Sequence, residues 1–121
     1  MDVQQLVEEA EDALRRGDFD RAEHAAEKVI VLRHAYGFEL LARIHARRDD
    51  LPRAIAILED GVSRAVQAWQ LWLLLGEYRS DHGDYDGALA AYDAAVAIAG
   101  VDADEVHINA AMALGAAGRP E

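Results

Sequence analysis

The sequence predicts an all-α protein of about seven helices, and three observations support this class. Apolar residues recur at spacings of three and four along most of the 121-residue chain, which is the period of an amphipathic helix. Gly and Pro are few, at 9 and 2 residues, and apolar residues, with Ala prominent, make up 52% of the chain. Short turns carrying Gly or Asp separate the periodic stretches, and no stretch alternates as a half-buried strand does. We therefore expect one helical domain over residues 1–121.

The first two helices form a predicted pair. The first should end at Gly17, because Gly accepts the left-handed backbone of a C-terminal cap. Asp18 can cap the second helix by accepting from its free N–H groups, and this helix runs to about Leu32. The buried stripes are expected to be Leu6, Ala10, Ala13 and Leu14 in the first helix and Phe19, Ala22, Ala26, Val29 and Ile30 in the second.

A second pair follows a short connection. The third helix is predicted over residues 35–47, and Asp49 and Asp50 make the next turn. Pro52 lies in the first turn of the fourth helix, where its missing N–H is harmless, and this helix extends to about Arg64. The expected buried residues are Phe38, Leu41, Ala42 and Ile44, then Ala54, Ile55, Leu58, Gly61 and Val62.

The remaining helices are predicted over residues 68–81, 85–99 and 104–117. Gly100 ends the sixth helix, and the sequence VDAD caps the seventh. Gly118 breaks the chain again, close to where it stops.

The turns repeat along the chain, which indicates stacked helix pairs rather than a single bundle. The segments RRGDFDRAE, RRDDLPRAI, DHGDYDGAL and AAGRPE align without a gap. Their third residues stand 32, 34 and 35 positions apart and are Gly17, Asp49, Gly83 and Gly118. Five positions later, the first three turns carry Ala22, Ala54 and Ala88. Small residues also precede each turn, where two helices must approach closely: Ala10, Ala42, Gly76 and Ala111. These regularities predict an α-solenoid with a period near 34 residues.

The third repeat carries the most specific motif. Its residues Trp72, Leu75, Gly76, Gly83, Tyr85, Ala88, Tyr92 and Ala95 match the pattern of an aromatic and a Leu-Gly pair before the turn, then an aromatic and small residues after it. The chain thereby resembles the tetratricopeptide repeat family, although Arg79 stands where the family usually has Tyr. The second repeat matches through Phe38, Leu41, Ala42, Leu51, Ala54 and Leu58, and the first through Gly17, Phe19, Ala22 and Ala26.

This resemblance implies a right-handed α-solenoid of antiparallel helix pairs. The repeats would span about residues 3–34, 35–68 and 69–102, with the first helix of a fourth repeat at 104–117. Gly76 and Ala88 would let the two helices of one repeat approach. Leu75, Tyr85 and Tyr92 would fill the space between repeats, and Trp72 would likewise be a spacer between helices.

Charge and composition exclude several classes of function. The formal net charge is −11, and residues 67–121 contain nine acidic residues but only Arg79 and Arg119 as bases. Such a surface repels nucleic acid and anionic lipid, so we expect neither as a partner. Cys is absent, which excludes disulfides and thiolate chemistry. The acidic N-terminus lacks an apolar run, and no stretch is long enough to cross a membrane, so a cytoplasmic location is expected.

No residue pattern indicates an enzyme, a cofactor or a metal site. The segment from His82 to Asp93 resembles a calcium loop in part, but His82 is a poor first ligand, and a turn with a helix cap explains the same residues. The five histidines are scattered, without a zinc spacing, and are expected to be mostly polar surface. Phosphate-binding and nucleophile motifs are absent. We therefore expect a protein without catalytic activity.

The resemblance implies a binding groove lined by the first helix of each pair. Carried onto this sequence, the inward positions are Glu11, Tyr36, Glu39, Arg43, Arg47, Gln70, Leu73, Glu77, Ile108 and Met112. Leu73 and Glu77 are the residues that the third repeat is expected to turn outward. The clamp with which chaperone-binding members hold a carboxylate is absent at these positions, so that ligand is not transferred. A partner protein or peptide with basic and apolar residues would suit them. The alternative is that they are ordinary surface and that binding occurs elsewhere.

The predicted seventh helix has no partner after it. Its apolar residues Val106, Ile108, Met112 and Leu114 would lie bare at the end of the stack. Either the chain is part of a longer repeat array, or this face pairs with a second copy to form a homodimer. If the second explanation holds, the alternative to binding a partner in the groove is that the protein is a structural element that assembles with itself through this helix.

Overall fold

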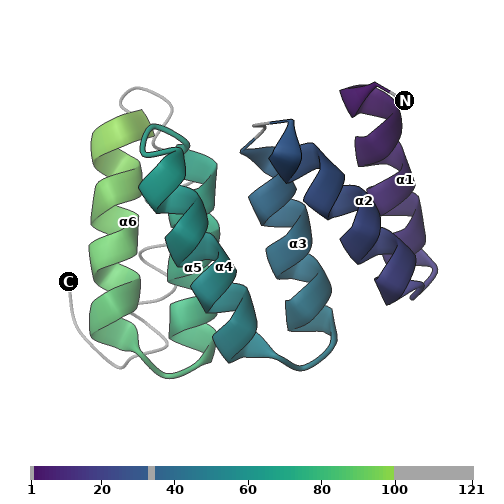
Figure 1. The fold of residues 1–121 in the computed structure, drawn as a ribbon. Coiled ribbons are helices and arrows are strands. Elements are labelled where there is room, and N and C mark those ends of the chain that lie inside the picture. Colours follow the sequence, from purple (N-terminus) through teal and green to yellow (C-terminus); the bar gives the residue numbers. More distant parts are fainter. Residues whose placement is uncertain (1, 33–34, 100–121) are drawn as a thin grey trace. The chain divides into compact units, whose positions relative to one another are not determined.

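The computed structural model describes residues 2–32 and 35–99 and is all-helical, with no strand among those residues. Each helix begins and ends close to where the sequence predicts (Figure 1). The described residues form the helices α1 (Val3–Arg15), α2 (Phe19–Val31), α3 (Tyr36–Arg47), α4 (Leu51–Arg64), α5 (Trp69–Asp81) and α6 (Tyr85–Ala99). The predicted all-α class is confirmed, and the expected seventh helix at 104–117 lies outside the described residues.

The chain divides into two compact units, Met1–Gly61 and Val62–Glu121. In the first unit, α1 packs on α2, and α3 packs on both; in the second, α5 packs on α6 (Figure 1). The division into repeats at about 3–34, 35–68 and 69–102 stays a prediction. None of the described helices is long and apolar enough to cross a membrane.

Local signals place α1 and α2 as the sequence predicts. Asp2 and Gln5 form a reciprocal capping box at the start of α1, which satisfies N–H groups that the helix cannot pair internally. The helix ends before Gly17, whose φ of +76° is the left-handed conformation expected there. The Asp18 carboxylate then accepts from the backbone N–H of Arg21, at 3.3 Å, and caps α2.

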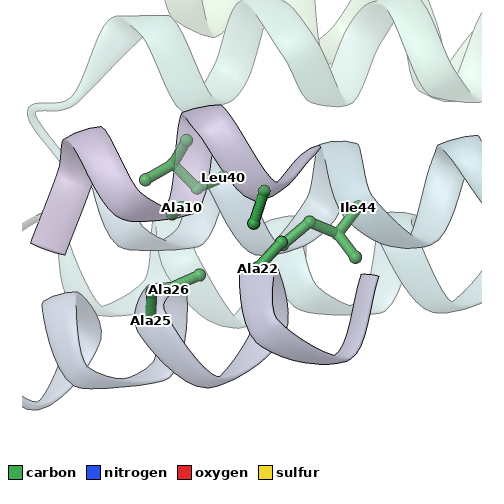
Figure 2. Close-up of a cluster of buried hydrophobic side chains, with 7 residues drawn as sticks. Ala10, Ala22, Ala25, Ala26, Leu40 and Ile44 are labelled. Carbon is green, nitrogen blue, oxygen red and sulfur yellow. The ribbon is translucent and has the colours of Figure 1, made fainter. Parts of the chain in front are cut away.

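The core of the first unit is built largely from small residues. Figure 2 shows four alanines of α1 and α2 lying beside Leu40 and Ile44 of α3. These alanines, Ala10, Ala22, Ala25 and Ala26, are almost completely buried. Because a methyl side chain occupies little space, the helix backbones approach closely, and the larger Leu40 and Ile44 fill the remaining volume. The buried stripes predicted for the first two helices are confirmed at Ala10, Ala22 and Ala26. The stripe predicted for the third helix omits Leu40, which is only 1% exposed.

The second unit contains a close helix contact at Gly76. A Cβ atom placed on Gly76 would lie 2.7 Å from Cε1 of Tyr92, so only glycine leaves room for this ring. Tyr92 therefore packs within the α5–α6 pair, where it helps to form a buried cluster with Ala88 and Ala95. The expectation that Gly76 lets the two helices approach is confirmed. The expectation that Tyr92 also fills the space between repeats stays a prediction.

Candidate protein-binding surface

Four residues predicted for the groove come together where α1 and α3 meet in the first unit. The Tyr36 hydroxyl of α3 donates to Oε2 of Glu11 on α1 at 2.7 Å. One turn further along α3, the Arg43 guanidinium lies 2.8 Å from the Glu39 carboxylate. We call Glu11, Tyr36, Glu39 and Arg43 the polar cluster. It contains two carboxylates and one cation, and it joins two helices that are expected to face the groove.

Burial changes the titration of two members of the polar cluster. Desolvation, followed by the hydrogen bond to Glu11, raises the pKa of the Tyr36 hydroxyl from 10.0 to about 12. Desolvation also raises the pKa of Glu39, Arg43 opposes that rise, and the Glu11 carboxylate adds to it. The effect of Glu11 on Glu39 means that the two carboxylates repel each other across the helix interface. The cluster is therefore an acidic site that is only partly neutralised by Arg43.

Arg47, also predicted for the groove, is tied to neighbouring helices. Its guanidinium donates to the backbone carbonyl of Leu14, near the end of α1. Its Cζ atom lies 5.5 Å from the ring centroid of Phe19, the first residue of α2, which is within cation–π range. Arg47 thus helps to hold α3 against the α1–α2 turn, and this structural contact is sufficient to explain it.

A second ionic group lies between α2 and α3, and the sequence analysis missed it. His45 is 6% exposed, and its Nε2 atom lies 3.3 Å from the Glu23 carboxylate. Arg48 reaches both Glu23, at 3.5 Å, and Asp20, at 2.7 Å. His45 is an exception to the expectation that most of the histidines are polar surface. It follows Leu41 by four positions and therefore lies on the predicted apolar stripe, a signal that identifies it as buried.

The predicted groove positions of α5 differ from one another in the structure. Gln70 is exposed and Glu77 is partly exposed. Leu73, expected to face outward, is only 8% exposed and packs with Ala88, Tyr92 and Ala95 of α6. The outward orientation predicted for Leu73 is therefore wrong, because α6 covers its side chain. Ile108 and Met112 lie outside the described residues, so self-association through the seventh helix stays a prediction.

The turn before α6 acts as a helix cap. The Asp84 carboxylate accepts from the backbone N–H of Gly87 at 3.0 Å, as the turn interpretation predicts. Within residues 2–32 and 35–99, no group of three or more His, Cys, Asp or Glu side chains is arranged to hold a metal ion.

Comparison with known structures gives the same architecture. The TPR2B-domain:pHsp70 complex of yeast Sti1 aligns with a TM-score of 0.79 and 19% identity, over 93% of this chain and 96% of that one. PcrH, known from Pseudomonas aeruginosa, aligns in its complex with the chaperone binding region of PopB, with a TM-score of 0.73 and 21% identity over 94% and 93% of the two chains. MamA aligns with a TM-score of 0.75 and 20% identity, over 97% of this chain and 69% of that one. At these identities the likeness concerns the fold.

The sequence itself matches a family model. No curated protein matches significantly. The model described as tetratricopeptide repeat matches residues 7–65 and, in a second overlapping register, residues 39–105. The two matches together extend over most of the sequence and include three of the four predicted turns, those at Gly17, Asp49 and Gly83. The chain therefore belongs to the tetratricopeptide repeat family.

Proposed function

We propose that this protein is a non-enzymatic interaction module that binds a segment of a partner protein, and that the polar cluster is part of its binding surface. Two solved structures with the same fold contain a partner, pHsp70 in one and the chaperone binding region of PopB in the other. The fold is thus compatible with binding a protein segment. The ligand of this chain must follow from its own residues, because one fold accepts many ligands.

The observation that carries the proposal is the pair of carboxylates, Glu11 and Glu39, on adjoining helices, of which Glu39 pairs with Arg43 and Glu11 accepts from the Tyr36 hydroxyl. The net charge of −11 gives the whole chain an attraction for basic partners, and the polar cluster concentrates two acids at one place. A partner segment with basic and apolar side chains fits this surface best. Arg47 and the buried Leu73 are assigned to structural contacts instead.

The test is binding of short fluorescein-labelled synthetic peptides, measured by fluorescence anisotropy. The peptides alternate Arg or Lys with Leu and Ala, and a matched set carries Glu in place of each basic residue. We expect the basic set to bind, to bind more weakly as salt rises, and to lose about three- to tenfold in affinity when Glu11 or Glu39 is changed to Gln. Gln preserves the shape of these partly buried side chains, so the fold is retained.

The matched control is Glu27→Gln, which removes the same charge from an exposed position of α2. It should lower affinity much less, because it changes only the long-range field. Equal losses for Glu27→Gln and Glu39→Gln, or preferential binding of the acidic peptides, would show that the polar cluster is not the binding surface.

A further inference from the structure

Glu39 is an unusual acid for an exposed binding surface, because its side chain is only 12% exposed. It lies between Phe38 and Leu40, both buried, on α3. A carboxylate in such a place is costly unless a cation or a set of hydrogen bonds compensates it. In the free protein Arg43 supplies that cation at 2.8 Å, from one turn further along the same helix.

Arg43 is much less enclosed than the carboxylate it contacts. Its side chain is 47% exposed, so the guanidinium covers Glu39 from the solvent side. An Arg-carboxylate pair with one exposed member contributes little to stability, and the long Arg side chain loses rotamer freedom while it is held. Replacement of Arg43 by another cation therefore costs little free energy, provided that the new cation pairs with the Glu39 carboxylate.

The surroundings of Glu39 favour a second cation. Glu11 lies close enough to affect the titration of Glu39, and its carboxylate is held by the Tyr36 hydroxyl at 2.7 Å. A guanidinium carries five donors in a planar fork and pairs with a carboxylate through two parallel hydrogen bonds, which the point charge of an ammonium group does less well. The site thus offers more acceptors and more negative charge than Arg43 neutralises.

The pair between Asp12 and Arg16 shows what an ordinary surface pair looks like in this protein. It has the same spacing of four residues and a distance of 3.1 Å, but the Asp12 side chain is 39% exposed. Asp12 is solvated whether or not Arg16 contacts it. The Glu39 side chain is only 12% exposed, so water compensates its charge far less when Arg43 leaves, and a second cation is favoured there.

We infer that Glu39 is the subsite for a basic side chain of the partner, and that Arg43 occupies this subsite in the free protein and leaves it when the partner binds. The inference rests on the proposed function and adds that Arg43 regulates the binding of the partner. Arg43 is an internal competitor, so it weakens binding and favours partners whose cation pairs more strongly with Glu39 than Arg43 does. A partner arginine should therefore be preferred to a lysine.

The experiment compares Arg43→Gln with Arg16→Gln, which removes the same charge from the Asp12 pair. The probes are the basic peptides described above and copies in which citrulline, a neutral isostere, replaces each arginine. Removing the competitor should raise affinity for arginine peptides about two- to fivefold, whereas Arg16→Gln should change affinity less than twofold. Glu39→Gln should reduce the preference for arginine over citrulline and remove the gain in affinity that Arg43→Gln produces.

Three other outcomes separate the two proposals. If the wild-type protein binds no basic peptide, both fail. If basic peptides bind but Arg43→Gln weakens binding, Arg43 is itself a contact residue and only the exchange is wrong. If Arg43→Gln and Arg16→Gln change the affinity for arginine peptides by the same factor, only the net charge of the protein matters, and the proposed exchange is again wrong.

A measurement on the wild-type chain avoids dependence on the folding of any variant. The NMR signals of the Arg43 guanidinium N–H groups, including the Nη2 group that contacts Glu39, report whether the guanidinium is held. Saturation with an arginine peptide should shift these signals to those of a freely solvated arginine. Unchanged Arg43 signals at saturation would overturn the exchange.

Discussion

Gly76 shows how one residue sets the spacing of a helix pair. A side chain at this position would meet the ring of Tyr92, which is only 3% exposed. We expect Gly76→Leu to overpack the α5–α6 contact and to lower the free energy of unfolding by about 1–3 kcal/mol, measured by urea denaturation.

The control for this substitution is Ala90→Leu, which adds a comparable side chain at an exposed position of α6. It should be close to neutral. In a Tyr92→Ala background the Gly76→Leu penalty should shrink, since the clashing ring is gone. An equal penalty in both backgrounds would mean that the strain comes from elsewhere.

The raised pKa of Tyr36 makes stability depend on pH in the alkaline range. The hydroxyl ionises at about 12 in the folded protein and near 10.0 when unperturbed, so the fold favours the neutral form. The contribution of the neutral Tyr36 hydroxyl to the free energy of unfolding is complete below pH 10 and is lost as the pH rises from 10 towards 12. Tyr36→Phe should therefore flatten the alkaline loss of stability, while at neutral pH it removes the hydrogen bond to Glu11 and costs about 0.5–1.5 kcal/mol.

Urea denaturation at a series of pH values measures both effects. Tyr92 shares the behaviour, because desolvation and the charges of Glu77 and Asp81 raise its pKa to about 12 as well. Tyr36→Phe and Tyr92→Phe should each reduce the fall of the free energy of unfolding above pH 10, which we call the alkaline limb. The double variant should reduce that fall more than either single variant. An alkaline limb that neither variant alters would contradict this assignment.

The turns give a comparison at the scale of secondary-structure elements. Gly17, Asp49 and Gly83 occupy the same position in three aligned turns, and all have positive φ, at 76°, 61° and 89°. Left-handed backbone is strained for a residue with a Cβ atom, although Asp tolerates it better than most. Asp49 therefore carries strain that the two glycines avoid.

We expect Asp49→Gly to raise the free energy of unfolding by about 0.5 kcal/mol, the relieved strain less the extra freedom of Gly in the unfolded chain. Gly83→Ala provides the opposite change, since an added Cβ would meet nothing within 4 Å and only the backbone conformation is strained. It should lower stability by about 1 kcal/mol. Thermal melts of both variants measure this, and destabilisation by Asp49→Gly would show that the Asp side chain has a role of its own.

The helices and turns could be predicted from the sequence because their signals are local. Caps such as Asp18 and left-handed residues such as Gly17 act within a few residues, and both were placed correctly. The buried faces were harder to predict. A single apolar stripe assumes that a helix is covered on one side, but α3 also buries Leu40 and His45.

The candidate site shows the same limitation. Sequence reasoning placed Glu11, Tyr36, Glu39 and Arg43 on one surface but could not tell that Glu39 is nearly buried and already paired. It placed Leu73 outward, whereas α6 covers it. Orientation on a helix with several neighbours depends on the exact angle of each contact, and the repeat period does not fix that angle.

At the scale of the whole molecule, the charge imbalance should affect stability. A net charge of −11 on 121 residues produces self-repulsion in the compact state, which salt screens. The exposed ion pairs, such as Arg16 with Asp12, are weakened by salt too, but each contributes little. The repulsion should dominate, so the melting temperature should rise between low and physiological ionic strength.

Sodium chloride and sodium sulfate at matched ionic strength distinguish screening from other salt effects. Screening predicts similar increases at low concentration, whereas exclusion of sulfate from the protein surface gives a larger increase at high concentration. A melting temperature that falls with added sodium chloride would mean that ion pairs outweigh the net charge.

The order in which the helices pack also has a consequence for how the chain folds. In each unit the main contacts join consecutive helices, α1 with α2, α2 with α3, and α5 with α6. Such contacts close only short loops, and proteins dominated by them fold rapidly. A helix pair can form as soon as both of its helices have been synthesised, without waiting for a distant part of the chain. The alanine-rich faces that would otherwise attract other chains are therefore covered early, while the rest of the protein is still being made.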